Sequence, residues 1–271
     1  MIPFSKMQGA GNDYVYVDNR NNTVTDPCAL APKVSDRHFG IGSDGLVLIG
    51  NSDKADARMR MFNPDGSESE MCGNASRCVA RFVWERWGLG KDTLTLETGA
   101  GIKIIDIKSE NGKFVSATVD MGEPILEPAR IPVLGDSNQI NLEGFDLTCV
   151  SMGNPHAVTF VDNVDTAPVL TQGPSLETNK VFPRKANIEF VQVISKDKVR
   201  MRVWERGTGE TLACGTGACA TTVACVLRGK THRKIELELL GGTLFIEWRE
   251  SDNHVLMTGP AEFVFDGIWK N

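Results

Sequence analysis

The chain lacks an excess of positive charge and lacks any long apolar run. Its 271 residues carry 29 Lys and Arg against 35 Asp and Glu, which gives a formal net charge of -6. Nucleic acid or an anionic membrane would favour a basic surface, and a membrane-spanning helix needs about 20 consecutive apolar residues. The start, MIPFSKMQGAGNDYVYVD, shows no charged flank leading into an apolar segment. We therefore expect a soluble cytoplasmic protein that acts on a small molecule, with no nucleic-acid and no membrane partner.

The usual sequence signatures of metals and nucleotides are also missing. The seven cysteines contain no Cys-x-x-Cys, and the four histidines show no metal-ligand spacing, so we expect no metal site. GIGSDG matches the dinucleotide pattern G-x-G-x-x-G, but LVLIG follows it directly and is typical of a strand, where that motif requires a helix. An odd number of cysteines in a chain without an export signal predicts free thiols.

An internal repeat organises the chain. Cys-Gly occurs at Cys72 and again at Cys214, 142 residues later, and each time a glutamate stands four residues before it. Other residues keep this offset, namely Gly11-Asn12 with Gly153-Asn154, Glu68 with Glu210, and Phe62-Asn63 with Trp204-Glu205. Small and apolar residues follow each Cys-Gly and stop before Gly88 and Gly229, which are typical of positions just past a helix end. The sequence therefore predicts that both cysteines stand at helix N-termini.

The rest of each half is rich in short alternating segments that predict strands. In the first half these are YVYVD, GLVLIG, ARMRMF, TLTLET, IKIIDI and FVSATVDM, and in the second AVTFVD, IEFVQVI, KVRMRVW, KIELELL and TLFIEW. We expect an α+β fold of two pseudo-symmetric domains, each a curved, mostly antiparallel sheet around a central helix. The predicted domains are 1–118, with 263–271 returning to it as a last strand, and 119–262, with the active site in the cleft between them.

The two helix N-termini suggest a reaction. Such an end presents free N–H groups and a partial positive charge, so we expect it to lower the pKa of a cysteine placed there and to attract carboxylates. A thiolate on one face of a carbon could remove a proton while a thiol on the other face delivers one. Because an epimerisation runs from either hand, each cysteine would act as acid in one direction and as base in the other.

Five long motifs add a resemblance to a known family: FSKMQGAGNDYVYVD, MFNPDGSESEMCGNASRC, SMGNPHAV, RKANIEFVQV and VWERGTGETLACGTGAC. They closely resemble diaminopimelate epimerase, and the similarity covers essentially the whole chain. The resemblance implies interconversion of LL- and meso-diaminopimelate for lysine and peptidoglycan precursors, with neither pyridoxal phosphate nor metal and thus no cofactor. It also implies a homodimer, with Phe265 at the interface.

The resemblance further implies roles for single residues. Cys72 and Cys214 match the acid/base pair, while His156 and Glu205 match positions that adjust the pKa of the cysteines. The positions that match substrate contacts are Asn12, Asn63, Gly73, Asn74, Asn154, Asn187, Glu205, Arg206, Gly215 and Thr216. Arg206 suits this role because a planar guanidinium is a natural bidentate partner for a carboxylate.

Other residues have plainer interpretations. The remaining cysteines are expected to be small apolar core residues, namely Cys28, Cys78, Cys149, Cys219 and Cys225. Asp44 in GSDG is expected to serve a turn. Glu68 and Glu210 are expected to make the same structural contact in the two repeats.

Three alternative functions stay open from the residues. One is a pyridoxal phosphate racemase, although no lysine stands out in either repeated motif. A proline or hydroxyproline racemase or epimerase would use the same pair of thiols, but its pocket would be smaller and more apolar than one holding a second ammonium and carboxylate. A catalytically silent small-molecule binding protein could be built on the same repeat. Retention of both cysteines argues against the silent protein.

Overall fold

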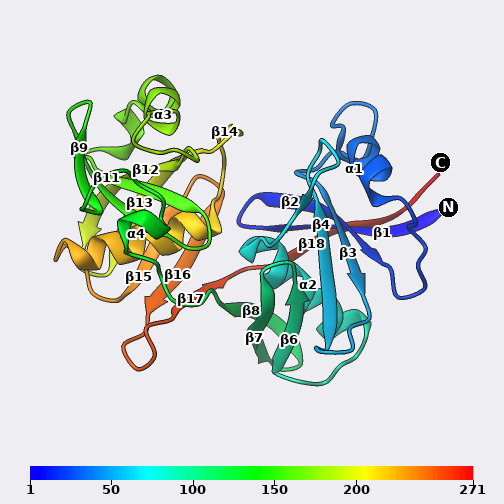
Figure 1. The fold of residues 1–271 in the computed structure, drawn as a ribbon. Coiled ribbons are helices and arrows are strands. Elements are labelled where there is room, and N and C mark those ends of the chain that lie inside the picture. Colours follow the sequence, from blue (N-terminus) through cyan, green and yellow to red (C-terminus); the bar gives the residue numbers. More distant parts are fainter. Residues whose placement is uncertain (271) are drawn as a thin grey trace. The chain divides into compact units, whose positions relative to one another are not determined.

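The computed structural model describes residues 1–270 of the chain as two compact units (Figure 1). Unit 1 is Met1–Asp120 together with the C-terminal segment from Thr258, and unit 2 is Met121–Met257. The returning segment thus begins at Thr258 rather than at residue 263, and unit 2 begins at Met121 rather than at residue 119. The hydroxyls of Thr118 and Thr258 lie 2.7 Å apart, which ties the returning chain to unit 1 from its first residue.

Unit 1 consists of nine strands and two helices. Its elements are β1 (Ile2–Gly9), β2 (Asn12–Asp18), α1 (Pro27–Ser35), β3 (Leu46–Gly50), β4 (Ala57–Phe62), β5 (Glu68–Ser69), α2 (Gly73–Arg86), β6 (Thr93–Thr98), β7 (Gly101–Glu110), β8 (Lys113–Asp120) and β18 (Glu262–Trp269). The sheet runs in the order β18, β1, β2, β3, β4, β6, β7, β8, with β5 also paired to β4. Only the β2–β3 and β4–β6 pairs among these are parallel, so the expectation of a mostly antiparallel sheet is confirmed.

Unit 2 repeats this arrangement. Its elements are β9 (Gln139–Leu142), β10 (Phe145–Ser151), β11 (Pro155–Phe160), α3 (Val169–Glu177), β12 (Asn187–Ser195), β13 (Lys198–Glu205), β14 (Gly209–Glu210), α4 (Gly215–Leu227), β15 (Lys234–Leu239), β16 (Gly242–Trp248) and β17 (Val255–Gly259), which crosses into unit 1, with short 3-10 turns η1 (Pro128–Arg130) and η2 (Val164–Thr166). The order is β9, β10, β11, β12, β13, β15, β16, and the parallel pairs β11–β12 and β13–β15 match those of unit 1. The repeat seen in the sequence is therefore a repeat of structure.

Each unit wraps its strands around one central helix. In unit 1, α2 packs against β1, β2, β4, β6, β7 and β8, and in unit 2, α4 packs against β10, β11, β12, β15 and β16. All but one of the residues from Gly215 to Cys225 of α4 are glycine, alanine, cysteine or threonine, and such short side chains let the strands approach the helix on all sides. A buried Arg77 in α2 donates from Nε to the carbonyl of Pro260 at 3.0 Å, which holds the returning segment in unit 1.

A second helix in each unit covers a separate apolar cluster. α1 closes a core that includes Val15, Leu46 and Phe62, and α3 closes one that includes Leu147, Ile188 and Phe190. Neither helix is among the sequence expectations, which place one helix in each half. Both are only nine residues long and contain an internal proline, which hides their period.

The predicted strands are all present, and so are the two predicted helix starts. The strands that the sequence did not predict include β1 and its counterpart β10, in which polar residues such as Ser5, Lys6 and Thr148 are buried and break the alternation of apolar and polar residues. Among residues 1–270, no helix is long and apolar enough to cross a membrane.

Candidate active site

Two equivalent hairpin tips carry the first pair of candidate residues. Gly11, between β1 and β2, has a φ of 84°, and Gly153, between β10 and β11, has a φ of 99°. This left-handed conformation suits glycine and lets the chain reverse directly before Asn12 and Asn154. Both asparagines therefore begin the second strand of a hairpin.

Cys72 is the N-cap residue of α2 in an extended conformation, and its side chain is half-buried. Its Sγ lies 3.4 Å from Oδ1 of Asn12, to which the thiol donates. The Asn12 amide is held by Asp44, which accepts from Nδ2 at 2.7 Å and from the backbone N–H of Asp13 at 3.1 Å. Asp44 thus fixes which end of the Asn12 amide faces the cysteine.

Cys214 is the N-cap residue of α4 and is buried. The N–H of Gly217 donates to its Sγ at 3.3 Å, and Oγ1 of Thr216 lies 3.6 Å from the same sulfur. Both predicted helix N-terminal positions are therefore confirmed, but only the thiol of Cys214 accepts a capping hydrogen bond from its own helix.

The expected lowering of the Cys214 pKa is wrong. Burial raises the pKa of the Cys214 thiol well above its ordinary value, and the carboxyl groups of Glu205 and Glu189 raise it further. The hydrogen bonds from Thr216 and Gly217 oppose the rise without cancelling it. Desolvation and two like-sign neighbours outweigh the partial charge of one helix end, so Cys214 is a thiol near neutral pH.

A fully buried pair lies beside Cys214. Nδ1 of His156 is 2.6 Å from Oε1 of Glu189, and neither side chain is exposed to solvent. Nε2 of the same ring is 3.1 Å from Oδ1 of Asn154, whose Nδ2 donates to Oγ1 of Thr216 at 3.3 Å. His156 and Asn154 are thus linked by hydrogen bonds to Thr216, which lies beside Cys214.

Glu205 and Arg206 follow one another at the end of β13. The Glu205 carboxyl group accepts from the hydroxyl of Thr211 and lies within hydrogen-bonding reach of the Cys214 thiol, and burial raises its pKa. Arg206 is exposed, and its Nη1 donates to the carbonyl of Arg184 at 3.1 Å. The backbone N–H of Arg206 donates to Oδ1 of Asn187 at 2.9 Å, so Asn187 holds the turn that carries the guanidinium.

The other residues predicted to contact the substrate lie in the turn after β4 and at the N-termini of α2 and α4. Asn63 follows β4, where Nδ2 donates to Oγ of Ser67 at 3.0 Å within a turn. Gly73 and Asn74 begin α2, and Gly215 and Thr216 begin α4, so their N–H groups belong to the helix ends. Oδ1 of Asn74 is buried and has no hydrogen-bond partner among the described residues.

The structure also shows where the remaining cysteines and Phe265 lie. All seven cysteines are free, as expected, but Cys28 is exposed and is not the core residue that the sequence suggested, because it lies on the outer side of the short helix α1. Phe265 on β18 is 48% exposed, and its ring packs edge-on against Phe4 at 5.9 Å. Among residues 1–270, no three His, Cys, Asp or Glu side chains are placed to hold a metal ion.

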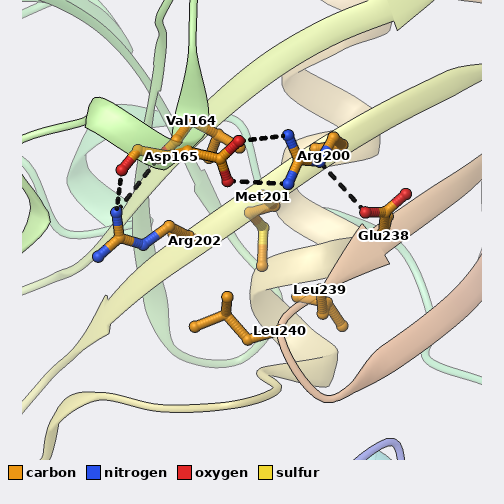
Figure 2. A pocket seen from close by; sticks show the side chains of 8 residues that line it. All are labelled: Val164, Asp165, Arg200, Met201, Arg202, Glu238, Leu239 and Leu240. Carbon is orange, nitrogen blue, oxygen red and sulfur yellow. Dashed lines mark hydrogen bonds and ion pairs between the residues drawn. The ribbon is translucent and has the colours of Figure 1, made fainter.

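A pocket of about 190 Å³ in unit 2 contains none of the predicted site residues. Figure 2 shows Arg200 between Asp165 and Glu238, with Met201, Leu239 and Leu240 below them. Arg200 is neutralised by Asp165 at 2.9 Å and by Glu238 at 3.2 Å. We interpret this pocket as an ion-paired surface hollow.

Comparison with known proteins identifies the family. The family model described as diaminopimelate epimerase matches residues 4–127 and 148–264. This chain belongs to the diaminopimelate epimerase family. The diaminopimelate epimerase of Desulfovibrio desulfuricans is 57% identical over 279 residues, which cover 98% of this chain and 97% of the relative. That of Methanococcus maripaludis strain S2 is 56% identical over 273 residues, which cover 98% and 99%.

The fold is shared more widely than the epimerase family. A solved structure described as a predicted epimerase from Pseudomonas aeruginosa aligns with a TM-score of 0.74 at 16% identity, over 100% of each chain. At this identity the likeness shows the fold alone. It confirms the diaminopimelate epimerase-like architecture that the resemblance implied.

Two residues that contact the candidate site were not predicted as functional from the sequence. Asp44 was interpreted as a turn residue, yet it bonds the side chain of Asn12. Glu189 was passed over within IEFVQVI, yet it is buried against His156. A glutamate between two apolar residues of this strand was the available signal, because buried carboxylates are rare unless they are paired.

Proposed function

We propose that this protein interconverts LL-diaminopimelate and meso-diaminopimelate by a two-base mechanism that needs no cofactor. The observation that carries the proposal is that Cys72 and Cys214 cap the repeat-equivalent helices α2 and α4. The substrate is inferred from the relatives named diaminopimelate epimerase. The reaction belongs to the synthesis of lysine and of peptidoglycan precursors, which is cytoplasmic chemistry.

The two cysteines divide the proton transfers. The environment of Cys214 holds it as a thiol near neutral pH, so it enters the cycle as the proton donor. Cys72 then acts as the base that removes the α-proton, and the roles exchange in the reverse direction. The mechanism requires both sulfurs to reach one α-carbon from opposite faces.

The substrate contacts follow from the helix ends and from the β13 turn. The N–H groups at Gly73, Asn74, Gly215 and Thr216 would bind the carboxylate next to the reacting carbon and stabilise the charge that develops on it. Arg206 would bind the distal carboxylate, and Glu205, Asn63 and Asn187 would complete the distal site. Asn12 and Asn154 would contact the substrate beside the two sulfurs.

The assembly that we propose is a homodimer through β18. Val264, Phe265 and Ile268 are all exposed on this strand, at 56%, 48% and 59%. Neighbouring exposed apolar side chains favour burial against a second copy. Sedimentation of the wild type and of a Phe265→Lys variant would test the dimer, since a charge at the interface would shift the protein to monomer.

The test of the function is NMR of reduced protein with LL-diaminopimelate in deuterated water, with no cofactor added. Appearance of the meso isomer with deuterium at the inverted centre would support the proposal. No exchange in fully reduced protein would contradict it. Proline and hydroxyproline would then be assayed in the same way, because a prolyl enzyme would exchange them and a silent binding protein would not.

Oxidation gives a second test of the shared centre. Two sulfurs that reach one carbon can also form a disulfide, so activity should vanish with a mild oxidant and return with a reductant. Mass spectrometry should show a Cys72–Cys214 linked peptide in the inactive form. Full activity of protein carrying that link would rule out the mechanism.

A further inference from the structure

Glu189 is a fully buried carboxylate whose only task so far is to help raise the pKa of the Cys214 thiol. It lies on β12, two residues after Asn187, and is 0% exposed. Its Oε1 faces Nδ1 of His156 at 2.6 Å, and its Oε2 has no hydrogen-bond partner among the described residues. Burying a carboxylate is costly, so a specific role must compensate for it.

The hydrogen bonds around His156 fix where the ring carries its protons. The short contact between Nδ1 and Oε1 of Glu189 requires one proton between them, held either by the ring or by the carboxyl group. On the other side, Nε2 faces an amide oxygen, Oδ1 of Asn154, which can only accept. In both forms of the pair, Nε2 therefore carries a proton and donates it to Asn154.

This donation orients the Asn154 amide. With Oδ1 bound to His156, the NH₂ group of Asn154 is directed at Oγ1 of Thr216, at 3.3 Å. Thr216 in turn lies 3.6 Å from the sulfur of Cys214. One hydrogen of the NH₂ group serves Thr216, which leaves the second for a ligand.

We propose that Glu189 is a positioning residue of the epimerase reaction, which acts through His156 to hold the NH₂ group of Asn154 toward Thr216 and Cys214. The proposal rests on the proposed function, because the substrate contact of Asn154 belongs to it. The Glu189 carboxyl group packs tightly against α4, since a methyl group at Gly217 would come within 2.8 Å of Oε1 of Glu189. The carboxyl group is therefore held in one place against the ring.

Two variants of similar size separate the hydrogen bond from packing. Glu189→Met keeps the length of the side chain but cannot bond Nδ1, so the ring samples both tautomers and Asn154 loses its orientation. We expect kcat/KM to fall by about tenfold, mainly through KM. Glu189→Gln can donate to Nδ1 and keep Nε2 protonated, so it should retain most of the wild-type kcat/KM.

A matched control and a mutant cycle exclude a general effect of lost charge or stability. Glu238→Met removes a carboxylate of the same unit that bonds Arg200 (Figure 2), and it should leave kcat/KM unchanged. If Glu189 acts through Asn154, then Glu189→Met should have little further effect in an Asn154→Ala background. Fully additive effects, or an unchanged kcat/KM for Glu189→Met, would overturn the proposal.

NMR of the histidine ring nitrogens provides a readout that needs no activity. The His156 signals, assigned with a His156→Gln variant, should show a protonated Nε2 in the wild type and a mixture of tautomers in Glu189→Met. If the wild type failed to convert diaminopimelate, the proposed function would be wrong, and the ring signals would still report whether Glu189 orients His156. A bare Nε2 in the wild type would overturn the inference even in an active enzyme.

Discussion

The surroundings of Cys72 and Cys214 differ although the two residues occupy equivalent places in the repeat. Cys72 is half-buried and donates to an amide oxygen, whereas Cys214 is buried beside two carboxyl groups. At the repeat offset of 142, the positions of Glu205 and Glu189 correspond to Asn63 and Val47 in unit 1. The two carboxyl groups beside Cys214 therefore have uncharged residues at the equivalent positions of unit 1.

Asn12 and Asn154, which are equivalent in the repeat, also differ in their hydrogen-bond partners. Asp44 accepts from the Asn12 amide and leaves its oxygen for Cys72. Nε2 of His156 faces the oxygen of the Asn154 amide, and the NH₂ group of that amide donates to Thr216. One half of the repeat thus offers an acceptor where the other offers a donor.

This difference shows how a duplicated scaffold can assign unequal roles. A symmetric pair of thiols would have no preferred protonation in the free enzyme, and two thiols or two thiolates cannot begin a reaction that needs one acid and one base. In the proposed mechanism, carboxyl groups on β12 and β13 make Cys214 the acid by raising its pKa. The repeated backbone would then supply the symmetry of the reaction, and side chains outside the helix ends would supply its starting state.

The largest effect should come from the sulfurs themselves. Cys72→Ser and Cys214→Ser each replace a thiol by a much weaker acid, so each should lower kcat for epimerisation by about a thousandfold. Both variants should be assayed from the LL and from the meso substrate, with deuterium exchange followed at the same time. Wild-type rates in either variant would remove that cysteine from the mechanism.

The next largest effect should be on the reactivity of the Cys214 thiol when a neighbouring carboxyl group is removed. Glu205→Gln removes one of the like-sign groups that raise the pKa of Cys214, so the thiolate should form at lower pH. Each unit by which this pKa falls should raise the alkylation rate of Cys214 about tenfold at a fixed alkaline pH.

Peptide-resolved mass spectrometry measures this alkylation with an internal standard. Cys28 is exposed and lies in unit 1, so its rate should not change in the variant. A Cys214 rate that stayed equal to the wild-type rate would show that Glu205 does not hold the thiol in its protonated form.

The sequence predicted elements better than it predicted electrostatics. The strands and the starts of α2 and α4 follow from local alternation, from small residues and from the glycines after each helix, all of which are properties of neighbours in the chain. α1 was missed despite Asp26, whose side chain accepts from the N–H of Ala29 at 3.0 Å, and Pro27 at the first helical position. Its short length and internal Pro32 concealed these start signals.

The pKa of Cys214 could not be predicted in the same way. A helix N-terminus is visible in the sequence, but the burial of the thiol and the approach of Glu189 depend on β12 and α4 meeting in space. The repeat itself offered a partial warning, because Val47 and Glu189 occupy equivalent positions and differ in charge. A place where two repeats differ is therefore a useful candidate for a specialised role.

A smaller effect should come from the third residue of each helix. Gly217 of α4 corresponds to Ala75 of α2, and a methyl group at Gly217 would meet Sγ of Cys214 at 3.1 Å as well as Glu189. Gly217→Ala should destabilise the protein by about 1–3 kcal/mol through overpacking, although alanine favours helices. Ala75→Gly should cost only about 0.5–1 kcal/mol of helix propensity. Urea unfolding of both variants tests this order, and a stabilised Gly217→Ala would contradict it.

The smallest effect should be a difference in stability between two ion pairs that the repeat places at equivalent positions. Arg60 bonds Glu68 at 2.7 Å with side chains 39% and 45% exposed, and Arg202 bonds Glu210 at 2.7 Å with side chains 16% and 18% exposed. Exposed pairs are worth about 0.2–1 kcal/mol because water and salt screen them. Removing one partner of a less exposed pair costs more, since the charge left behind is less solvated. Glu68→Gln should therefore change the free energy of unfolding less than Glu210→Gln, and added salt should shrink the Glu68 effect first. Equal losses with equal salt dependence would show that the two repeats differ only around their cysteines.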